Sequence, residues 1–238
     1  AVGLDTISNE RLFELLTTLE HGPVLAELLR VLGGRPTPQK WPILLTFLES
    51  ENDDVRAAAA QALSNHPMDS VIPLLERLLV DPDARVRRSA ATLIGKLNVR
   101  HLADSLLALA SNSDRLLQNA CLDSLRRLED SRAIPLAVQA LQLPEMQLAA
   151  LSYLGDQAGP SLLETVATAA EKSRSRDVLA AAVHALTTWQ ASISPASQDW
   201  QQIENAIAGL QGNSGEILLW RVRGGMSAEA ATAYLDSE

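Results

Sequence analysis

Aromatic residues and cysteine are both scarce in this sequence of 238 residues. Aromatic residues make up 3% of the chain although hydrophobic residues make up 47%, so the core must be built from Leu, Ala, Val and Ile. Because Ala and Leu are strong helix formers, this composition favours helices over strands. A single cysteine, Cys121, excludes an intrachain disulfide. We expect Cys121 to be a small buried hydrophobic residue.

Long apolar runs and an excess of positive charge are also absent. No stretch approaches the roughly 18 apolar residues that a membrane-spanning helix needs, and no signal peptide is visible. The net charge of −9 disfavours nucleic acids and anionic membranes as partners, because an acidic surface repels phosphate groups. We therefore expect a soluble protein, with the cytoplasm slightly favoured. The chain begins with Ala-Val rather than Met, which indicates a processed product or one module of a larger chain.

Catalytic and ligand-binding motifs are the third absence. The sequence contains no Walker loop, no dinucleotide-binding glycine fingerprint and no nucleophile elbow. None of the four histidines, His21, His66, His101 and His184, has a metal-ligand spacing to another ligating residue on one helix. The acidic turn at residues 49–54 lacks the pattern of a calcium loop, and we expect it to be solvated. The sequence therefore predicts no catalytic residue, no cofactor and no metal site.

A period of 31 residues is the strongest positive signal. One column of aliphatic residues recurs at this spacing through Val24, Val55, Val86, Leu117, Leu148 and Leu179. A fixed period in this range is typical of a stacked repeat array, in which each repeat is one unit of secondary structures that packs on its neighbours. We expect the array to span residues 1–193.

Each repeat is expected to contain two helices, as residues 70–97 illustrate. The first helix has Pro73 in its first turn, where a missing N–H is tolerated, and it ends at Asp81-Pro82. Asp83 is a suitable N-cap for the second helix, which Asn98 ends. Asp53 and Asp114 are the expected N-caps in the repeats on either side.

The rhythm changes toward the C-terminus. A polar run at residues 171–177 lengthens the linker inside the fifth repeat, either as a tolerated surface insertion or as a binding feature. Beyond the array, we expect residues 194–238 to form a helical cap that belongs to the same structural unit. In this cap a helix at about 196–210 is followed by a turn at 211–215 and a short helix at 216–222.

Two segments carry a resemblance to a known family. The sequences IPLLERLLVDPDARVRRSAATLIGKL and WPILLTFLESENDDVRAAAAQAL resemble HEAT repeats in the first-helix proline, the Asp-Pro-Asp turn and the Val-Arg that opens the second helix. The resemblance implies an all-α fold, a right-handed α-solenoid of about six two-helix repeats with a C-terminal helical cap. It also implies a polar ladder between repeats, with Asp81 and Arg87 in the ladder positions and Arg56 in the adjoining repeat.

Most HEAT arrays bind proteins, so we expect a non-catalytic interaction scaffold that is one module of a larger chain. Its partner would be another protein or a neighbouring domain of the same polypeptide. The second helices of such arrays line the concave surface, and arginine is enriched at interface hot spots. The candidate partner-binding residues on this face are Arg56, Arg85, Arg88, Gln118 and Arg127.

The alternative is an enzyme on the same scaffold, because some HEAT-type proteins are bilin lyases and one group are alkylpurine DNA glycosylases. A lyase of this kind would use His184, Trp189 or Cys121 near a groove. A glycosylase would need a continuous basic groove with an aromatic residue and a carboxylate beside it.

Overall fold

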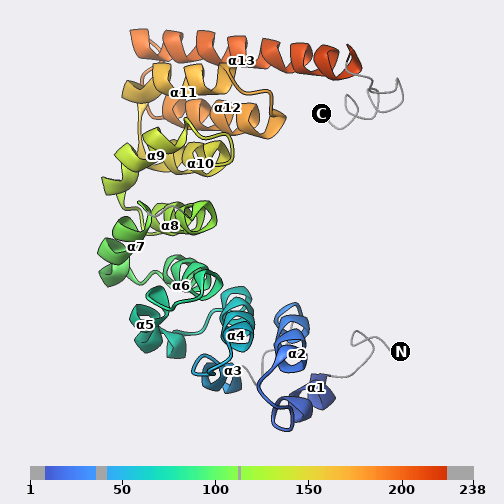
Figure 1. The fold of residues 1–238 in the computed structure, drawn as a ribbon. Coiled ribbons are helices and arrows are strands. Elements are labelled where there is room, and N and C mark those ends of the chain that lie inside the picture. The colour runs from blue at the N-terminus through green and yellow to red at the C-terminus, as the bar shows by residue number, and fades with distance from the viewer. Residues whose placement is uncertain (1–8, 36–41, 112–113, 224–238) are drawn as a thin grey trace. The chain divides into compact units, whose positions relative to one another are not determined.

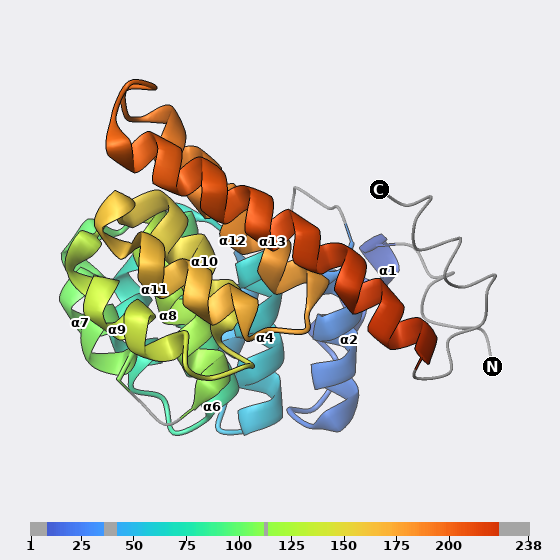
Figure 2. The same cartoon turned by 90° about the horizontal axis from the view of Figure 1, so that it is seen from above.

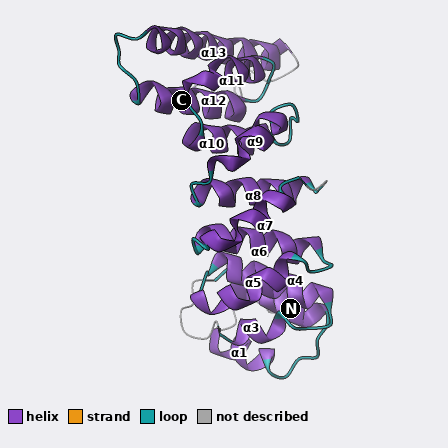
Figure 3. Cartoon of the chain, turned by 90° about the vertical axis from the view of Figure 1, so that its left-hand side faces the viewer, coloured by secondary structure: helices purple, strands orange, loops and turns teal. Residues whose placement is uncertain are grey.

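The structure is a computed structural model, and it describes residues 9–35, 42–111 and 114–223. Every regular element in these ranges is a helix (Figure 3). The chain forms two compact units, unit 1 from Ala1 to Asp130 and unit 2 from Ser131 to Glu238. The fold is thus all-α and of the α-solenoid type, as the periodicity and composition predict. Among the described residues, no helix has the length and apolarity needed to cross a membrane.

Unit 1 consists of four helix pairs, which Figure 1 shows as two layers. In each pair the first helix lies in the outer layer and the second helix lies on the inner side of the curve that this unit follows. The described pairs are α1 (Asn9–Leu16) with α2 (Pro23–Gly33), α3 (Ile43–Phe47) with α4 (Asp53–Asn65), α5 (Leu75–Leu79, preceded by the 3-10 turn η2, Asp69–Leu74) with α6 (Ala84–Lys96), and α7 (Ala103–Leu109, preceded by η3, Arg100–Leu102) with α8 (Arg115–Arg127).

Unit 2 is also built from helix pairs, and its last described element is a long helix. Its described elements are η4 (Ser131–Ala133), α9 (Ile134–Ala140), α10 (Gln147–Gln157), η5 (Pro160–Leu162), α11 (Leu163–Glu171), α12 (Arg176–Ala191) and α13 (Gln198–Arg223). Helix α13 packs along α11 and α12 (Figure 2), and its Ile203 and Leu210 are buried. The division of the chain into an array at 1–193 and a cap at 194–238 differs from the boundary between the two compact units and remains a prediction.

Turn chemistry fixes most helix starts where the sequence predicts. The Asp83 carboxylate accepts the backbone N–H of Arg85 at 2.7 Å and caps α6, and Asp114 caps α8 in the same way. The prediction for Asp53 was wrong, because the preceding residue Asn52 caps α4 by accepting the N–H of Val55. Asp53 lies in the first turn of that helix, where its charge favours the helix dipole.

The period of 31 residues places a core residue correctly at four of its six positions and fails at the first and the fifth. Val55, Val86, Leu117 and Leu179 are buried, whereas Val24 is 67% exposed and Leu148 is 49% exposed. Leu25 and Met146 occupy the core in their place. Because each residue turns a helix by about 100°, a shift of one or two residues moves a side chain to another face. The linker before each helix, rather than a fixed count, sets which residue enters the core.

Three glycines let second helices approach closely. An added Cβ at Gly33 would lie 2.8 Å from the Cα of Ala62, and one at Gly95 would lie 2.6 Å from the Cα of Ser124. In unit 2 the corresponding pair is looser, with 3.1 Å between an added Cβ at Gly155 and the Cβ of Ala185. The second helices α2 and α4, α6 and α8, and α10 and α12 therefore pack almost backbone to backbone near these glycines.

Two further predictions about unit 2 were wrong. The linker between α11 and α12 is only residues 172–175, because the helices extend into the polar run. Helix α13 is continuous through residues 211–215, where we expected a turn. A glycine inside a helix costs only about 1 kcal/mol relative to alanine, and without a proline the backbone hydrogen-bond ladder can continue through Gly212 and Gly215.

Candidate functional site

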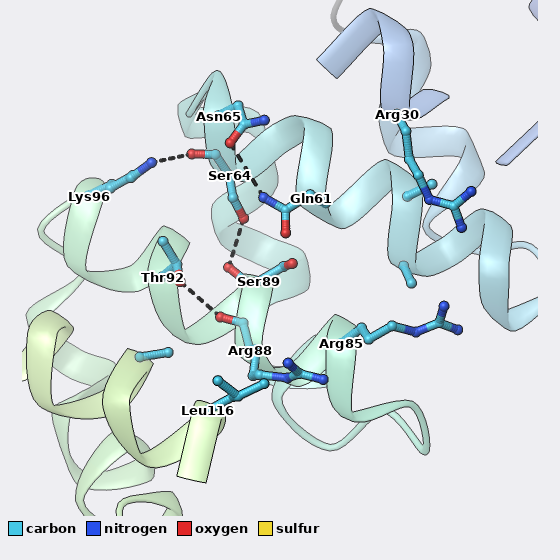
Figure 4. Close-up of a pocket in the computed structure, with 13 residues that line it drawn as sticks. Arg30, Gln61, Ser64, Asn65, Arg85, Arg88, Ser89, Thr92, Lys96 and Leu116 are labelled. Atoms are coloured by element: carbon cyan, nitrogen blue, oxygen red, sulfur yellow. Dashed lines mark hydrogen bonds between the residues drawn. The ribbon is translucent and has the colours of Figure 1, made fainter. Parts of the chain in front are cut away.

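A groove of about 440 Å³ crosses the second helices of unit 1 (Figure 4). We call it the unit 1 groove. Its lining comes from α2, α4, α6 and α8, and consists of Arg30, Ala57, Ala58, Gln61, Ser64, Asn65, Arg85, Arg88, Ser89, Thr92, Lys96, Leu116 and Ala120. Small side chains on α4, α6 and α8 leave room, and long polar side chains surround them. The groove lies on the face where the resemblance places partner binding.

Four of the lining residues are cations, and none of the lining residues is acidic. Arg30, Arg85 and Arg88 lie toward one side of the groove, whereas Lys96 lies on the opposite side beyond Gln61 (Figure 4). In a chain with a net charge of −9, this lining reverses the average sign of the surface. A local cluster of this kind attracts negatively charged groups.

The cations are held in place by neighbouring groups outside the lining. The guanidinium of Arg85 donates two hydrogen bonds of 3.1 and 2.6 Å to the carboxylate of Asp83, from Nε and Nη2 to Oδ2, and a third of 2.8 Å to Asp54. Arg88 donates from Nε to the backbone carbonyl of Ala84 at 3.2 Å. These contacts fix the guanidinium groups before any ligand arrives, so less side-chain entropy is lost on binding.

The Asp83–Arg85 pair also changes the acidity of its members. The hydrogen bonds from Arg85 lower the pKa of Asp83 below its usual value, although partial burial opposes this shift. The hydrogen bonds to Asp83 and Asp54 raise the pKa of Arg85. Arg85 therefore remains charged at every pH at which the protein is folded.

On the side of the groove where Lys96 lies, hydrogen bonds connect neighbouring repeats. The Lys96 ammonium donates to the Ser64 carbonyl at 2.5 Å, and the buried Ser64 hydroxyl donates to the Ser89 carbonyl at 3.2 Å. Asn65 donates to the Gly33 carbonyl at 3.1 Å. The Ser64 and Gly33 carbonyls lie at the C-terminal ends of α4 and α2, where carbonyls lack a partner within the helix, and the three bonds together link α2, α4 and α6.

The structure brings two of the five predicted partner-binding residues together. Arg85 and Arg88 both line the unit 1 groove, whereas Arg56, Gln118 and Arg127 do not. Gln118 donates to the Ala110 carbonyl at 3.0 Å, and Arg127 pairs with Asp123 at 2.8 Å with 43% of its side chain exposed. The partner-binding role of these residues remains a prediction.

Arg56 has a different place, in a ladder between two repeats. Its guanidinium donates to both carboxylate oxygens of Asp81, at 2.9 and 3.1 Å, and each of the two side chains is only 11% exposed. The same guanidinium binds the carbonyls of Ser50 and Glu51 in the linker between α3 and α4 of its own repeat. The hydrogen bonds to Asp81 raise the pKa of Arg56. This is a structural contact that joins two turns.

The second ladder position differs from the expectation. Arg87 donates to the backbone carbonyls of Asp81 and Pro82, at 2.6 and 2.8 Å, within its own repeat. The residue one period after Asp81 is Asn112, which lies outside the described residues. The described ladder contact between repeats therefore runs from Arg56 to Asp81.

The groove also contains residues that the sequence interpretation missed, chiefly Arg30, Gln61, Lys96 and Leu116. A signal for them was present, because Arg30 and Gln61 are one period apart and Leu116 follows Arg85 at the same interval. Since these residues come from different repeats, their proximity depends on the spacing of the helices as well as on the period.

The other candidate chemical groups are used in packing. Burial raises the pKa of the Cys121 thiol to about 12, and the side chain is fully buried, as predicted. The His21 ring hydrogen-bonds with the Ser50 hydroxyl at 2.8 Å, and His66 donates to the Gly33 carbonyl at 3.1 Å. In the described ranges, no group of three His, Cys, Asp or Glu side chains is placed to hold a metal ion.

Comparison with known proteins decides the family. The family model for HEAT repeats matches residues 9–93 and 71–145, which together cover more than half of the chain. The chain belongs to the HEAT-repeat family. Its helix pairs, its first-helix prolines and the Arg56–Asp81 contact are therefore HEAT features, and the unit 1 groove lies on the second-helix face of HEAT repeats.

The chain is similar to part of two larger proteins. The chain is 30% identical over 144 residues to coatomer subunit gamma-2 of Xenopus tropicalis, covering 53% of this chain and 16% of that protein. It is 25% identical over 168 residues to coatomer subunit gamma-2 of Bos taurus, covering 63% of this chain and 19% of the relative. The matched region thus spans less than a fifth of the length of these relatives.

A solved structure shares the fold. It is a chain in the complex of CpcE and CpcF of phycocyanin lyase from Nostoc sp. PCC7120, with a TM-score of 0.52 and 18% sequence identity. The likeness covers 85% of this chain and 83% of the other. At this identity the likeness supports a HEAT-type arrangement of helices and carries no information on activity.

Proposed function

We propose that this HEAT array is a non-catalytic scaffold that binds another protein, or a neighbouring domain of its own polypeptide, through the unit 1 groove. The observation that carries the proposal is the lining: four cations and no carboxylate on a face built from four second helices. Several side chains along one groove provide a surface that a polypeptide segment can follow, and arginine is frequent at interface hot spots.

The relatives support a role in assembly. Two of them are named as subunits of coatomer, and the solved structure with the shared fold is a complex of two proteins. Repeat arrays present extended surfaces because each repeat adds a similar face beside the previous one. We infer that this chain likewise acts within an assembly.

Charge reversal in the groove tests the proposal. The variant Arg85→Glu/Arg88→Glu is expected to lose the partners that the wild-type chain retains in affinity capture from cell extract, measured by quantitative mass spectrometry. The matched control is Arg77→Glu/Arg100→Glu, which reverses two arginines that are 53% and 59% exposed outside the groove. Circular dichroism melting of each variant establishes that it is folded.

The outcomes separate clearly. Partners that the control retains and the groove variant loses support the proposal. Partners that both variants retain contradict it, because the groove is then not the binding face. The milder variant Arg85→Gln/Arg88→Gln provides the same comparison should the double reversal unfold the array.

The lyase alternative has a separate test. The residues proposed for it are dispersed: His184 is exposed on α12, Trp189 is buried on the same helix and donates to the Gly155 carbonyl, and Cys121 belongs to unit 1. Titration of the protein with a free bilin, followed by absorption spectroscopy, would show a spectral shift if the scaffold bound a tetrapyrrole.

A further inference from the structure

We propose that the ligand of the unit 1 groove is an acidic peptide segment that carries at least one leucine-sized apolar side chain. The inference rests on the proposed function and names the chemistry of the partner. It uses three features of the groove: its cations, the carboxylates that hold them and an exposed leucine.

The cations define the acidic part of the ligand. Arg30, Arg85 and Arg88 come from two helices and gather on one side of the groove, and Lys96 lies on the other side (Figure 4). A peptide lying along this face would place carboxylates near both groups. Arginine binds carboxylates in a bidentate geometry, which adds orientation as well as attraction.

The neighbouring carboxylates distinguish a peptide from a nucleic acid. Arg30 pairs with Glu27 at 3.0 Å and Arg85 pairs with Asp54 at 2.8 Å, and the four side chains are 43 to 58% exposed. Because exposed pairs of this kind contribute little free energy, a ligand carboxylate can replace Asp54 or Glu27 at low cost. A phosphodiester backbone instead gains affinity by neutralising many phosphates with unpaired cations, and here acidic residues accompany each arginine.

Leu116 defines the apolar part of the ligand. It lies in the first turn of α8, lines the groove with Ala120 and is 58% exposed. Ala57 and Ala58 of α4 line the same groove on the far side of α6. Leu116, with Ala120 one turn further along the same helix, can receive an apolar side chain of the ligand, and burying it adds affinity that salt does not screen.

Peptide selection tests the chemistry directly. The full chain is immobilised and used to select from a displayed library of random 12-residue peptides, with Arg85→Gln/Arg88→Gln as a parallel target. Selected peptides are expected to be enriched in Asp and Glu and to contain Leu, Ile, Val or Met. In fluorescence anisotropy, such a labelled peptide is expected to bind the wild-type chain at least tenfold more tightly than the double variant.

Leu116→Ser separates the apolar contribution from the charge. We expect this variant to weaken binding of an apolar-containing peptide about tenfold, and to leave unchanged the binding of the same peptide with its apolar residue replaced by alanine. Inorganic phosphate and a single-stranded oligonucleotide serve as competing probes. Arg100→Gln is the control for charge loss outside the groove.

Each result bears on the proposal. Selected peptides without acidic enrichment, an unchanged affinity for the double variant, or equal binding of the oligonucleotide would overturn the acidic peptide as the ligand. If cellular partners are still lost on charge reversal while acidic peptides fail to bind, the scaffold function stands and only the ligand class is wrong. If charge reversal leaves the capture of cellular partners unchanged and the double variant binds the acidic peptide as tightly as wild type, both proposals fail.

Discussion

Helix α6 of unit 1 and helix α10 of unit 2 correspond residue by residue when their buried positions are aligned. At one constant offset, Val86 matches Met146, Ala90 matches Ala150 and Gly95 matches Gly155, and all six residues are buried. At the same offset, three exposed or half-exposed positions differ in charge: Arg85, Arg88 and Lys96 in α6 correspond to Glu145, Leu148 and Asp156 in unit 2.

The difference separates what packing requires from what a surface is free to vary. Buried positions must keep small or aliphatic side chains because neighbouring second helices approach closely at the glycines. The exposed positions carry no such constraint, and they are cationic in one unit and acidic or apolar in the other. Under the proposed function, specificity would therefore belong to the exposed positions of individual repeats.

The glycine contacts give the largest expected effect. Gly95→Ala places a Cβ 2.6 Å from Ser124, and relief of that overlap requires backbone movement. We expect it to lower the free energy of unfolding by about 2 to 3 kcal/mol, measured by denaturant titration with far-ultraviolet circular dichroism. Gly155→Ala in unit 2 is expected to cost about 1 kcal/mol, because its nearest contact is 3.1 Å.

The comparison has an internal control and a local probe. Gly209→Ala adds a methyl group on α13 with nothing within 4 Å, and should stabilise the protein by up to about 1 kcal/mol through helix propensity.

Cys121, with a pKa of about 12 and a buried side chain, should react with a thiol reagent only when unit 1 opens. Faster labelling in Gly155→Ala than in Gly95→Ala would contradict the assignment of these contacts to separate units.

The polar contacts that second helices make with neighbouring elements are expected to give the next largest changes in the free energy of unfolding. Arg56→Ala removes a partner of Asp81, both 11% exposed, and should cost about 2 kcal/mol because a largely buried carboxylate loses its counterion. Trp189→Phe in unit 2 removes the 3.2 Å hydrogen bond to the Gly155 carbonyl and should cost about 1 kcal/mol.

Salt distinguishes these two ties. The cost of Arg56→Ala should fall when thermal or denaturant unfolding is repeated in 1 M NaCl, since ionic contacts are screened. The cost of Trp189→Phe should stay unchanged, because that bond joins neutral groups. Equal salt dependence would show that dissolved salt does not screen the Arg56–Asp81 pair. The exposed pair Arg100–Glu129 provides a control, with less than about 0.5 kcal/mol expected for Arg100→Ala.

Acid should weaken unit 1 through Asp83. The pKa of this carboxylate is lowered in the folded chain by Arg85, so its contribution to stability is present above about pH 4, the ordinary value for Asp. It is lost as pH falls through the lower folded-state pKa. Asp83→Asn keeps a capping oxygen, and should cost no more than about 1 kcal/mol at pH 7.

The measurement is the difference in unfolding free energy between wild type and Asp83→Asn across a pH series. That difference should shrink below pH 4 and approach zero once Asp83 is protonated. A constant difference down to pH 2 would mean that the charge of Asp83 contributes nothing to stability.

Helix ends give the smallest effect. Asn98 and Glu129 follow α6 and α8 with φ of 54° and 57°, a left-handed conformation that glycine adopts without strain. Glu129→Gly should stabilise unit 1 by about 0.5 to 1 kcal/mol, measured by thermal melting. Asn98→Gly should give a smaller gain, because asparagine tolerates this conformation better than glutamate. A loss of stability in both variants would contradict this account.

Much of the fold could be predicted from local patterns. The period, the apolar spacing and the Asp83 and Asp114 caps depend on neighbouring residues in the chain, and the structure confirms them. The burial of Met146 and the exposure of Leu148 could not be predicted from the period, because the turn that precedes α10 sets the phase of that helix. A constant period of 31 residues cannot account for a linker whose geometry changes from one repeat to the next.

The candidate site was predictable only in part. Arg85 and Arg88 share a helix face three residues apart, so the sequence alone places them together. Arg30 and Lys96 belong to other repeats or to the far end of α6, and their place beside the same groove depends on how closely the second helices pack. The glycines that set this packing were visible in the sequence, but their contact partners were not.

Because the offset between α6 and α10 is constant, the cations that α6 contributes to the groove could be introduced at the corresponding positions of unit 2. Glu145→Arg, Leu148→Arg and Asp156→Lys would write the α6 pattern onto the second helix of another repeat without altering a buried residue. Repeats should thus be aligned at the matching glycines Gly95 and Gly155, rather than at a fixed number of residues, when exposed residues are exchanged between them. A binding surface could therefore be moved between repeats by changing exposed residues only, with the buried core left as it is.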